Sequence, residues 1–223
     1  MSLQNIHYIV FDLNGTLVSE NYLRYDTVFE DVLHCQRRDR GLTIDDLRTV
    51  SRGRMSLNQM ITRIYLTDNA EFISHQFVYL QASRITLRKQ ALAILKFLQR
   101  RYPLLLCSDT TGIAKAVVKN LDLVRYFMKI FYSCDVGYLK SEEKFWTLFQ
   151  SWFPQASPKE FLVVGDNSRA DVLNPVRLGM HTIKIDNPLT LSLDYREASF
   201  PSDEEQPAYH IRELAELLPL LNL

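Results

Sequence analysis

Polar side chains able to form an anion or metal site recur in this sequence, each shortly after a run of apolar residues. The set contains carboxylates, one hydroxyl and one lysine: Asp12, Ser108, Asp109, Lys140, Asp166 and Asp171. Carboxylates that lie close together repel one another unless a cation joins them. Oxygen ligands of this kind select a hard ion such as Mg²⁺, which takes one or two carboxylates, several waters and phosphate oxygens.

The hydroxyl and the lysine complement these carboxylates. Ser108 offers a hydrogen-bond donor and Lys140 a point charge, so the pair can hold a tetrahedral anion such as phosphate. A carboxylate beside a phosphate whose charge a metal neutralises can attack it and form an aspartyl phosphate. The sequence has no glycine-rich phosphate loop of the Walker or dinucleotide-binding type. The residues therefore indicate phosphoryl transfer to a carboxylate.

The hydrophobic pattern predicts the scaffold that must position these side chains. Continuous apolar runs typical of buried strands occupy residues 6–11, 104–107, 130–132, 161–164 and 182–185. Amphipathic helices are expected near 91–98, 113–121, 145–152, 169–178 and 211–221. Buried strands alternating with helices indicate the α/β class, as a doubly wound parallel sheet with helices on both faces. Ligands bind such sheets outside the carboxyl ends of the strands, where the polar set is expected.

Residues 19–86 differ from the rest of the chain. This stretch shows helical patterns, no strand-like run and many arginines, whereas the first lysine of the protein is Lys89. We therefore expect an α/β core domain formed by residues 1–18 and 87–223, with a helical cap domain of residues 19–86 inserted after the first strand. The polar stretch from Asn187 to Gln206 is expected to be a loop or flap.

Composition excludes several classes of protein. The chain of 223 residues has 26 basic and 26 acidic residues, so it lacks the strong positive field that non-specific nucleic-acid binding requires. No apolar run approaches the roughly 20 residues that span a bilayer, and the first residues do not resemble a signal peptide. The 3 cysteines are expected to be reduced thiols. We expect a cytoplasmic protein that binds neither nucleic acid nor membrane; the sequence leaves the oligomeric state open.

Four ordered segments resemble the motifs of the haloacid dehalogenase (HAD) superfamily. They are Asp12-Leu13-Asn14-Gly15-Thr16, Ser108-Asp109, Lys140 and Gly165-Asp166-Asn167-Ser168-Arg169-Ala170-Asp171. The inserted stretch resembles the small helical cap of the branch that includes phosphoglycolate phosphatase and β-phosphoglucomutase. This resemblance implies a Rossmann-like core, a Mg²⁺ cofactor and a small phosphorylated metabolite as substrate.

The resemblance implies a metal centre formed by the first and last motifs. Asp12 corresponds to the nucleophile, which is also a metal ligand, and the backbone carbonyl of Asn14 corresponds to a second metal contact. Asp166 corresponds to the acidic metal ligand and Asp171 to the second acid of the same motif. The acid at position 166 argues against dehalogenase chemistry, which in this family proceeds without a metal. The expected function is therefore that of a Mg²⁺-dependent phosphohydrolase.

The resemblance also implies a substrate site formed by the second and third motifs and the cap. Ser108 and Lys140 correspond to the pair that holds the phosphate, and Asp109 stands where relatives often carry Asn. Arg54 lies where relatives place a substrate-reading loop and is a candidate to hold a distal anionic group. The alternative for Arg54 is an ordinary solvated arginine at a helix end.

Asn14 departs from the family's phosphatases, which carry Asp two residues after the nucleophile. That Asp protonates the leaving oxygen and later activates water, whereas an amide has no proton to donate at neutral pH. Loss of a positioned general acid–base costs about 10²–10⁴ in rate. Three interpretations stay open. In the first, the protein is a slow phosphatase for substrates with good leaving groups, such as aryl or acyl phosphates. In the second, it is a catalytically impaired domain that binds phosphate or regulates a partner. In the third, another group supplies the proton, and Asp109 is the nearest candidate in sequence.

Both tryptophans are expected in the hydrophobic core rather than in a substrate site. Trp146 and Trp152 lie in the helix expected over 145–152, and Trp152 falls on the apolar face of that helix.

Overall fold

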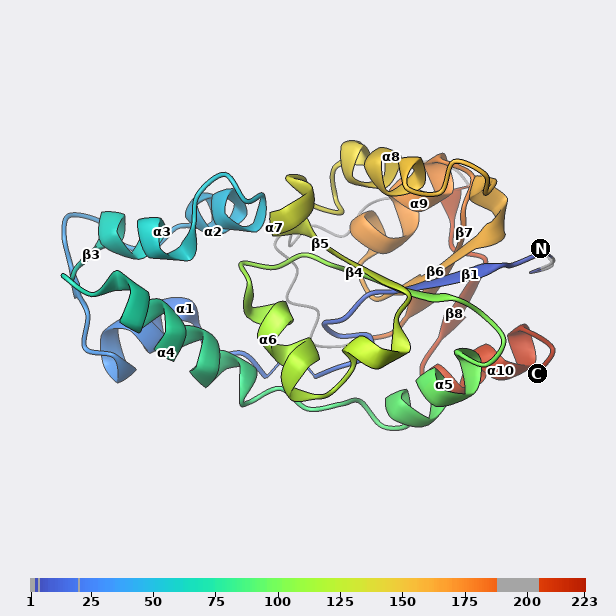
Figure 1. Ribbon diagram of the computed structural model, residues 1–223, viewed down its shortest axis with the longest axis horizontal. Helices are drawn as coiled ribbons and strands as arrows, with labels where there is room; N and C mark the ends of the chain where they lie inside the picture. The colour runs from blue at the N-terminus through green and yellow to red at the C-terminus, as the bar shows by residue number, and fades with distance from the viewer. Residues whose placement is uncertain (1–2, 4, 20, 188–204) are drawn as a thin grey trace.

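A six-stranded parallel sheet forms the centre of the larger part of the molecule (Figure 1). The computed structural model describes residues 3, 5–19, 21–187 and 205–223. The strand order is β5-β4-β1-β6-β7-β8, and all neighbouring strands are parallel. The strands are β1 (Tyr8–Phe11), β4 (Leu104–Ser108), β5 (Lys129–Tyr132), β6 (Phe161–Gly165), β7 (His181–Ile185) and β8 (Tyr209–Ile211). Because β1 lies between β4 and β6, the loops that follow these three strands meet at one edge of the sheet.

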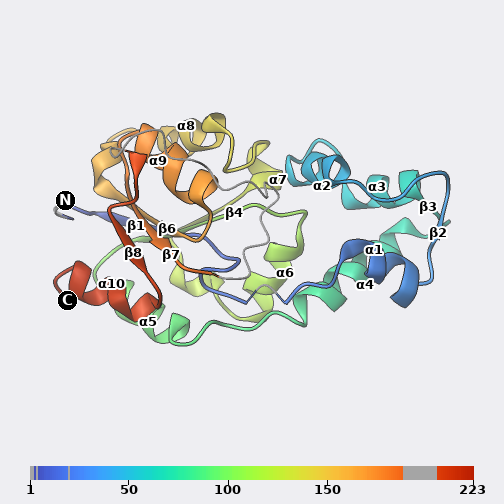
Figure 2. The ribbon, with the colours of Figure 1, turned by 180° about the vertical axis from the view of Figure 1, so that it is seen from behind.

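Successive residues of the central strands face opposite sides of the sheet. In β1, Ile9 and Phe11 pack in one hydrophobic layer and Val10 in the other. Helices α5 (Ala91–Leu98), α6 (Ile113–Asn120) and α10 (Leu217–Leu220) cover one face, and α8 (Glu143–Ser151) and α9 (Asn174–Arg177) cover the other (Figures 1 and 2). Burial on both faces explains the continuous apolar runs. The predicted doubly wound α/β fold is confirmed.

Short helical segments connect these elements. They are α7 (Ser133–Val136), a π-helical turn Ser168–Leu173 and 3-10 turns at Val124–Tyr126, Pro158–Glu160 and Leu214–Glu216. The helix expected over 169–178 is thus built from the π-helical turn and α9. Its first turn is capped by the Asn167 side chain, which accepts hydrogen bonds from the backbone N–H groups of Arg169 (3.0 Å) and Ala170 (2.8 Å).

The segment of residues 21–86 lies beyond the carboxyl ends of the core strands (Figure 1). It contains α1 (Tyr25–Thr27), a π-helical turn Val28–Val32, α2 (Ile44–Ser51), α3 (Leu57–Ile64) and α4 (Ala70–Ala82). The chain enters and leaves it side by side, because the N–H of Ser19 donates to the carbonyl of Thr86 (2.8 Å) and Val18 pairs with Leu87. One expectation is wrong: β2 (Gln36–Arg37) and β3 (Tyr65–Leu66) form an antiparallel pair there. Strands of 2 residues are too short to produce a periodic pattern.

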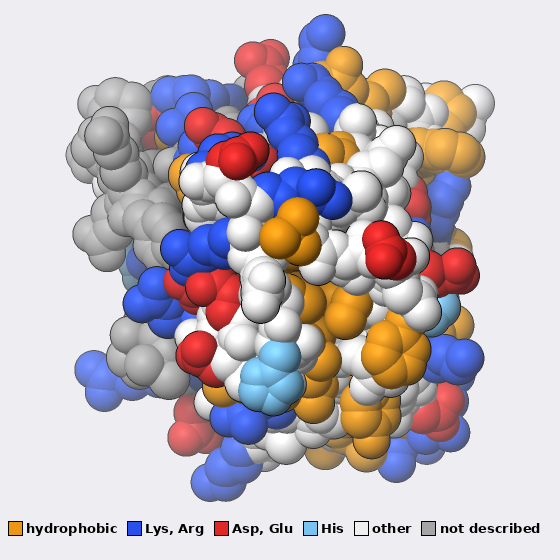
Figure 3. Space-filling view, turned by 90° about the vertical axis from the view of Figure 1, so that its left-hand side faces the viewer, with side chains coloured by type: hydrophobic (Ala, Val, Ile, Leu, Met, Phe, Trp, Pro, Cys, Tyr) orange, Lys and Arg blue, Asp and Glu red, His pale blue; other side chains and the backbone are white. Residues whose placement is uncertain are grey.

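Arginines in residues 21–86 form ion pairs with nearby acids. Arg24 contacts Asp26 (2.8 Å), and Arg40 contacts Asp46 (2.6 Å). Viewed from this end of the molecule, acidic side chains are interspersed with the basic ones (Figure 3). None of the helices in the described part of the chain has the length and apolar composition needed to cross a bilayer.

The carboxyl-terminal segment contains a strand where the pattern predicts helix. Ile211 has helical spacing to Leu214 and Leu218, but it ends β8 and pairs with Ile185 of β7. The helical part is limited to the 3-10 turn and α10. Apolar residues at this spacing are compatible with a short edge strand as well as with a helix. Pairing with the free edge of β7 favours the strand. Residues 188–204, most of the stretch expected to be a loop or flap, lie outside the described part of the chain.

The two tryptophans have opposite environments. Trp146 is fully buried, and its indole N–H donates to the carbonyls of Lys140 and Ala170, both at 2.9 Å. Trp152 is 61% exposed, so its expected place in the core is wrong. Trp152 follows Ser151, the last residue of α8, at the surface, and the ammonium of Lys129 lies 3.1 Å from the centre of its ring.

Replacing Trp146 by Phe should lower the free energy of unfolding by about 2 kcal/mol, because the buried carbonyl of Ala170 loses its indole donor. Trp152→Phe is the matched control, since it keeps a ring on the surface and should change stability by less than about 0.5 kcal/mol. Urea unfolding of both variants gives the comparison. Equal losses in the two variants would contradict the role assigned to the indole N–H.

Candidate active site

Three carboxylates converge at the carboxyl edge of the sheet. Asp12 directly follows β1 and Asp166 directly follows the neighbouring strand β6, while Asp171 comes from the π-helical turn after β6. One ligand oxygen from each residue lies within 4.8 Å of the others. All three side chains are buried. The structure therefore brings together the carboxylates that the sequence places in the first and last motifs.

Two glycines make this convergence possible. Gly15 has a φ of 73°, and a Cβ there would overlap the carboxylate of Asp166. A Cβ at Gly165 would likewise overlap the carboxylate of Asp171. The backbone after β1 also turns tightly, because the N–H groups of Leu17 and Val18 both donate to the carbonyl of Leu13. Glycine is needed at position 15 for both its backbone angle and its contact with the acid cluster.

Lys140 is the cation of this cluster. Its Nζ donates to Oδ1 of Asp12 and to Oδ1 of Asp171 (2.7 Å), and the side chain is buried. Burial alone would lower the pKa of Lys140, but the carboxylates of Asp12 and Asp171 outweigh it and hold the pKa well above its usual value. Lys140 therefore stays protonated at neutral pH.

The charge of the cluster favours a further cation. Burial and the carboxylates of Asp171 and Asp166 raise the pKa of Asp12, although Lys140 opposes the shift. Among the described residues, Asp12 and Asp171 share the ammonium of Lys140, and a divalent ion would add positive charge beside the three carboxylates. An all-oxygen ligand set of this kind fits Mg²⁺. Asp166 is positioned by a residue that the sequence analysis missed: the side-chain amide of Asn187 donates to Oδ2 of Asp166 (2.8 Å).

The loop that carries Lys140 is fixed from three sides. The backbone carbonyl of Lys140 accepts hydrogen bonds from the indole N–H of Trp146 (2.9 Å) and the side-chain amide of Asn174 (3.0 Å). Its backbone N–H donates to Oδ1 of Asp109 (2.9 Å). Ser108, the other residue expected to hold phosphate, is fully buried at the end of β4, next to β1. The second and third motifs thus meet the first motif at the same edge of the sheet.

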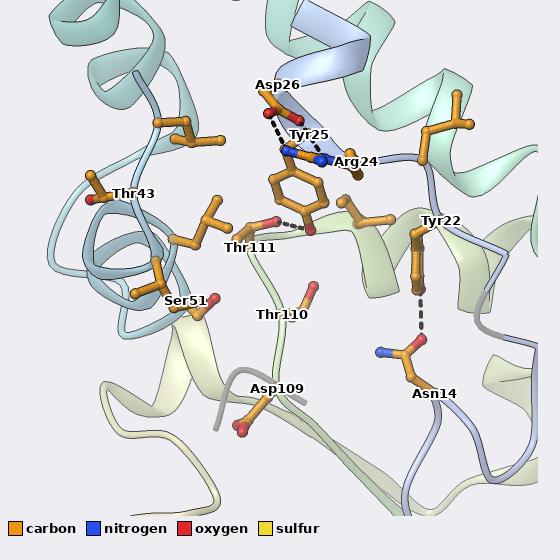
Figure 4. A pocket seen from close by; sticks show the side chains of 15 residues that line it. Asn14, Tyr22, Arg24, Tyr25, Asp26, Thr43, Ser51, Asp109, Thr110 and Thr111 are labelled. Carbon is orange, nitrogen blue, oxygen red and sulfur yellow. Dashed lines mark hydrogen bonds and ion pairs between the residues drawn. The ribbon is translucent and has the colours of Figure 1, made fainter. Parts of the chain in front are cut away.

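Asn14 lies at the inner end of a pocket and is held by hydrogen bonding. The hydroxyl of Tyr22 donates to Oδ1 of Asn14 (2.6 Å), and the side-chain nitrogen of Asn14 points into the pocket (Figure 4). The amide thus presents a hydrogen-bond donor where a carboxylic acid would present a transferable proton. Nothing in the sequence marked Tyr22 as a partner of Asn14, because the contact depends on how the chain leaves the core.

Asp109 lines the same pocket but faces a different way. Its side chain points away from Asn14 in Figure 4, and Oδ1 accepts from the backbone of Lys140. Burial raises the pKa of Asp109 to about 6. This geometry makes Asp109 a brace for the Lys140 loop rather than a substitute for the missing acid at position 14.

Arg54 is exposed and does not line the pocket. The neighbouring residues make the contacts with the core. Arg52 forms an ion pair with Glu142 (2.9 Å), whose carboxylate also accepts from the backbone N–H of Leu139 (2.8 Å). A Cβ at Gly53 would overlap the carbonyl of Cys134. The sequence thus located the loop that touches the core but not the arginine that makes the contact.

The pocket lies between α1, α2 and the loop after β4 (Figure 4). Its volume is about 400 Å³. Apolar and aromatic side chains line it beside polar ones, with Tyr22, Tyr25, Leu47 and Ile113 among the former. None of these four residues belongs to a motif, so no pattern in the sequence predicts that they line a pocket.

The parallel sheet, its helices and the acid cluster at the strand ends define an α/β protein with a candidate metal-binding active site. Residues 6–173 match the family model of haloacid dehalogenase-like hydrolases. The chain belongs to this family.

Known proteins share the fold. The Bacillus subtilis HAD-hydrolase YfnB is 26% identical over 136 residues, which span 60% of this chain and 53% of YfnB. The aligned sequence thus covers about half of that relative. The structure of YfnB bound to magnesium matches with a TM-score of 0.67 at 20% identity, over 99% of this chain and 100% of that one.

Two further solved structures have the same architecture. The HAD phosphatase from Thermococcus onnurineus matches with a TM-score of 0.63 at 18% identity, over 97% of this chain and 98% of that one. The enzyme bt-2542 from Bacteroides thetaiotaomicron, in complex with magnesium and inorganic phosphate, matches with a TM-score of 0.63 at 19% identity, over 86% and 100% of the two chains.

Millimolar Mg²⁺ should raise the melting temperature by a few degrees, because the ion binds the assembled carboxylates of the folded state only. Asp166→Ala should abolish the rise. Asp135→Ala removes an exposed acid that pairs with Lys115, outside the cluster, and should leave the rise unchanged. Thermal melts with and without Mg²⁺ test both variants, and a wild-type curve that Mg²⁺ does not move would contradict the site.

Asp109 should make stability depend on pH. Its pKa of about 6 in the folded protein exceeds the ordinary value near 4, so the folded state binds the proton more tightly. The contribution of Asp109 to stability therefore falls as pH rises from about 4 to 6. Asp109→Asn removes this pH-dependent loss of stability and keeps a side-chain oxygen that accepts from the backbone N–H of Lys140. Its stability relative to wild type should increase by about 1–2 kcal/mol between pH 4.5 and 7.

Urea unfolding at the two pH values measures this difference, with the exposed Asp45→Asn as the control. A difference between Asp109→Asn and wild type that is the same at pH 4.5 and pH 7 would show that burial does not perturb Asp109.

Proposed function

We propose that this protein is a Mg²⁺-dependent phosphohydrolase that cleaves a small phosphorylated metabolite through an aspartyl phosphate on Asp12. One observation carries the proposal: a buried nucleophilic carboxylate contacts a buried lysine and lies within 4.8 Å of two further carboxylates. This arrangement combines a group that attacks phosphorus, a cation for the phosphate oxygens and a ligand set for a divalent ion. A cytoplasmic location fits a substrate of this kind.

Each motif residue has a role in this reaction. Asp12, the backbone carbonyl of Asn14, Asp166 and Asp171 would hold Mg²⁺, which when bound neutralises charge on the phosphate. Lys140 lies against Asp12 and would hold a phosphate oxygen together with Ser108 at the end of β4.

The covalent steps belong to Asp12. A carboxylate oxygen of Asp12 forms a bond to phosphorus as the bond to the leaving oxygen breaks. Water then attacks the aspartyl phosphate, releases phosphate and restores the carboxylate. Residues 19–86 act as a cap in this proposal, since the pocket they share with the core lies directly over Asn14 and would be shielded from bulk water when substrate is bound.

Asn14 determines which substrates such an enzyme can cleave. Its amide can donate a hydrogen bond to the leaving oxygen but cannot transfer a proton. Asp109 is directed to the Lys140 loop instead. The rate of cleavage should therefore depend on how readily the leaving alcohol departs as its anion. This supports the interpretation of a slow phosphatase for good leaving groups.

The second candidate is a catalytically impaired domain that binds phosphate or regulates a partner. The observation that favours it is the same Asn14, which is firmly held by Tyr22 beside an otherwise complete acid cluster. A phosphatase assay over a panel of phosphoesters in Mg²⁺, with Asp12→Asn as the inactive reference, decides between the two. Turnover that requires Asp12 supports the enzyme, and its absence from every member of the panel supports the binding domain.

Asn14→Asp should raise turnover of alkyl phosphates by about 10²-fold or more, because it restores a general acid–base. The new carboxylate would lie two residues from Asp12 and close to the acid cluster. Like-charge repulsion then raises the pKa of one carboxyl group, as an acid at neutral pH requires. The double variant Asp12→Asn with Asn14→Asp controls for contaminating phosphatase.

Intact mass must accompany this assay, since deamidation at Asn14-Gly15 would create Asp without mutation and add about one dalton. If Asn14→Asp binds Mg²⁺ and stays as inactive as the parent protein, Asn14 is not what limits activity.

A further inference from the structure

We propose that the pocket above Asn14 selects an uncharged aromatic leaving group, so that the substrate is a phosphate monoester of a phenol-type alcohol. This inference rests on the proposed function and names its substrate class. Two independent features support it: the character of the pocket wall and the chemistry available at position 14.

The pocket wall is apolar over most of its surface. Its aliphatic residues come from the segment before α1, the loop and helix of α2, and the start of α6: Leu23, Leu42, Ile44, Leu47 and Ile113. Two phenol rings, those of Tyr22 and Tyr25, also line the pocket. Its remaining lining residues are polar or charged: Asn14, Arg24, Asp26, Thr43, Ser51, Asp109, Thr110 and Thr111. Apolar and aromatic walls favour a ring, because burying its faces removes apolar surface from water and permits ring–ring contact.

Charged groups in the pocket are already engaged. Arg24 is the sole cation among the described residues that line it, and its guanidinium binds both carboxylate oxygens of Asp26 at 3.2 and 2.8 Å (Figure 4). Asp109 accepts from the Lys140 backbone. A leaving group with a carboxylate or a second phosphate would lose its water here without gaining a free cation. The pocket thus offers no free cation, among its described lining residues, to a distal anionic group of the substrate.

The dimensions and direction of the pocket fit the same class. A volume of about 400 Å³ accommodates a one- or two-ring group. Asn14, two residues after Asp12 in the chain, lies at one end of the pocket, and Tyr25 lies away from it toward the other end (Figure 4). A phosphate placed at Asp12 would therefore direct its ester group past Asn14 and between the apolar walls.

The chemistry at Asn14 agrees with the wall. When an Asp12 oxygen bonds to phosphorus, the ester P–O bond breaks and its electron pair stays on the leaving oxygen. An aryl oxygen accepts that pair without a proton donor, because phenolate is far more stable than an alkoxide, and it takes its proton from water afterwards. The Asn14 amide needs only to donate a hydrogen bond. Apolar walls and a missing acid thus point to one substrate class.

Binding of phosphonates to the wild-type protein in Mg²⁺ tests the inference separately from catalysis, since their P–C bond is not hydrolysed. Calorimetry would compare methylphosphonate, benzylphosphonate and 2-carboxyethylphosphonate. We expect benzylphosphonate to bind at least about tenfold more tightly than methylphosphonate, from burial of its ring. The carboxyethyl compound should bind no more tightly than methylphosphonate. Equal affinities for the benzyl and methyl compounds, or tightest binding of the carboxyethyl compound, would overturn the inference.

A variant that should reverse this order of affinities gives the matched test. Leu47→Arg adds a cation to the pocket wall. It should weaken the binding of benzylphosphonate by about tenfold and strengthen the binding of the carboxyethyl compound. Leu66→Arg, at an exposed leucine of β3 outside the pocket, should leave the wild-type order unchanged. If Leu47→Arg melts at the wild-type temperature and keeps the wild-type order, the pocket does not hold the ester group.

The two proposals fail in different ways. Absence of turnover together with the expected phosphonate order removes the phosphohydrolase and keeps an aryl-phosphate binding site. Turnover that requires Asp12, together with a preference for the carboxyethyl compound, keeps the phosphohydrolase and removes the aryl substrate class.

Discussion

The buried ammonium of Lys140, in contact with Asp12 and Asp171, is the interaction on which the rest of the site depends. A buried charge without a partner is costly, and the pairing offsets that cost only if the geometry is well maintained. The protein maintains it through the backbone of Lys140, which Trp146, Asn174 and Asp109 hold. Three hydrogen bonds thus hold the backbone of Lys140 in the loop after β5.

In the described part of the chain, the ammonium of Lys140 pairs with two of the three carboxylates of the cluster. An acid cluster fully neutralised by lysines would need no ion, whereas three carboxylates beside Lys140 suit a divalent cation and a phosphate together. Gly15 and Gly165 permit the approach of the acids because neither has a side chain to displace them. Gly15 and Gly165 thus make room for the acid cluster without taking a direct part in the chemistry.

Asn14 marks the border between two environments. Towards the sheet lie buried charges, and towards α1 and α2 lies a pocket of aliphatic and aromatic side chains. Tyr22 belongs to the segment that enters the cap, yet it fixes the amide of the core loop. The position of residues 21–86 therefore influences the group that would meet the leaving oxygen, which couples substrate selection to the chemistry.

The sequence by itself determined the α/β fold, the central strands and the edge at which the acids meet, because continuous apolar runs and the polar residues after them are local features. Only the tertiary structure decided what depends on distant partners. Ile211 joined β8 because β7 offered a free edge, and the ring of Trp152, just past the end of α8, lies at the surface beside Lys129. Asn187 reached Asp166, and Tyr22 reached Asn14, through chain paths that no local pattern encodes.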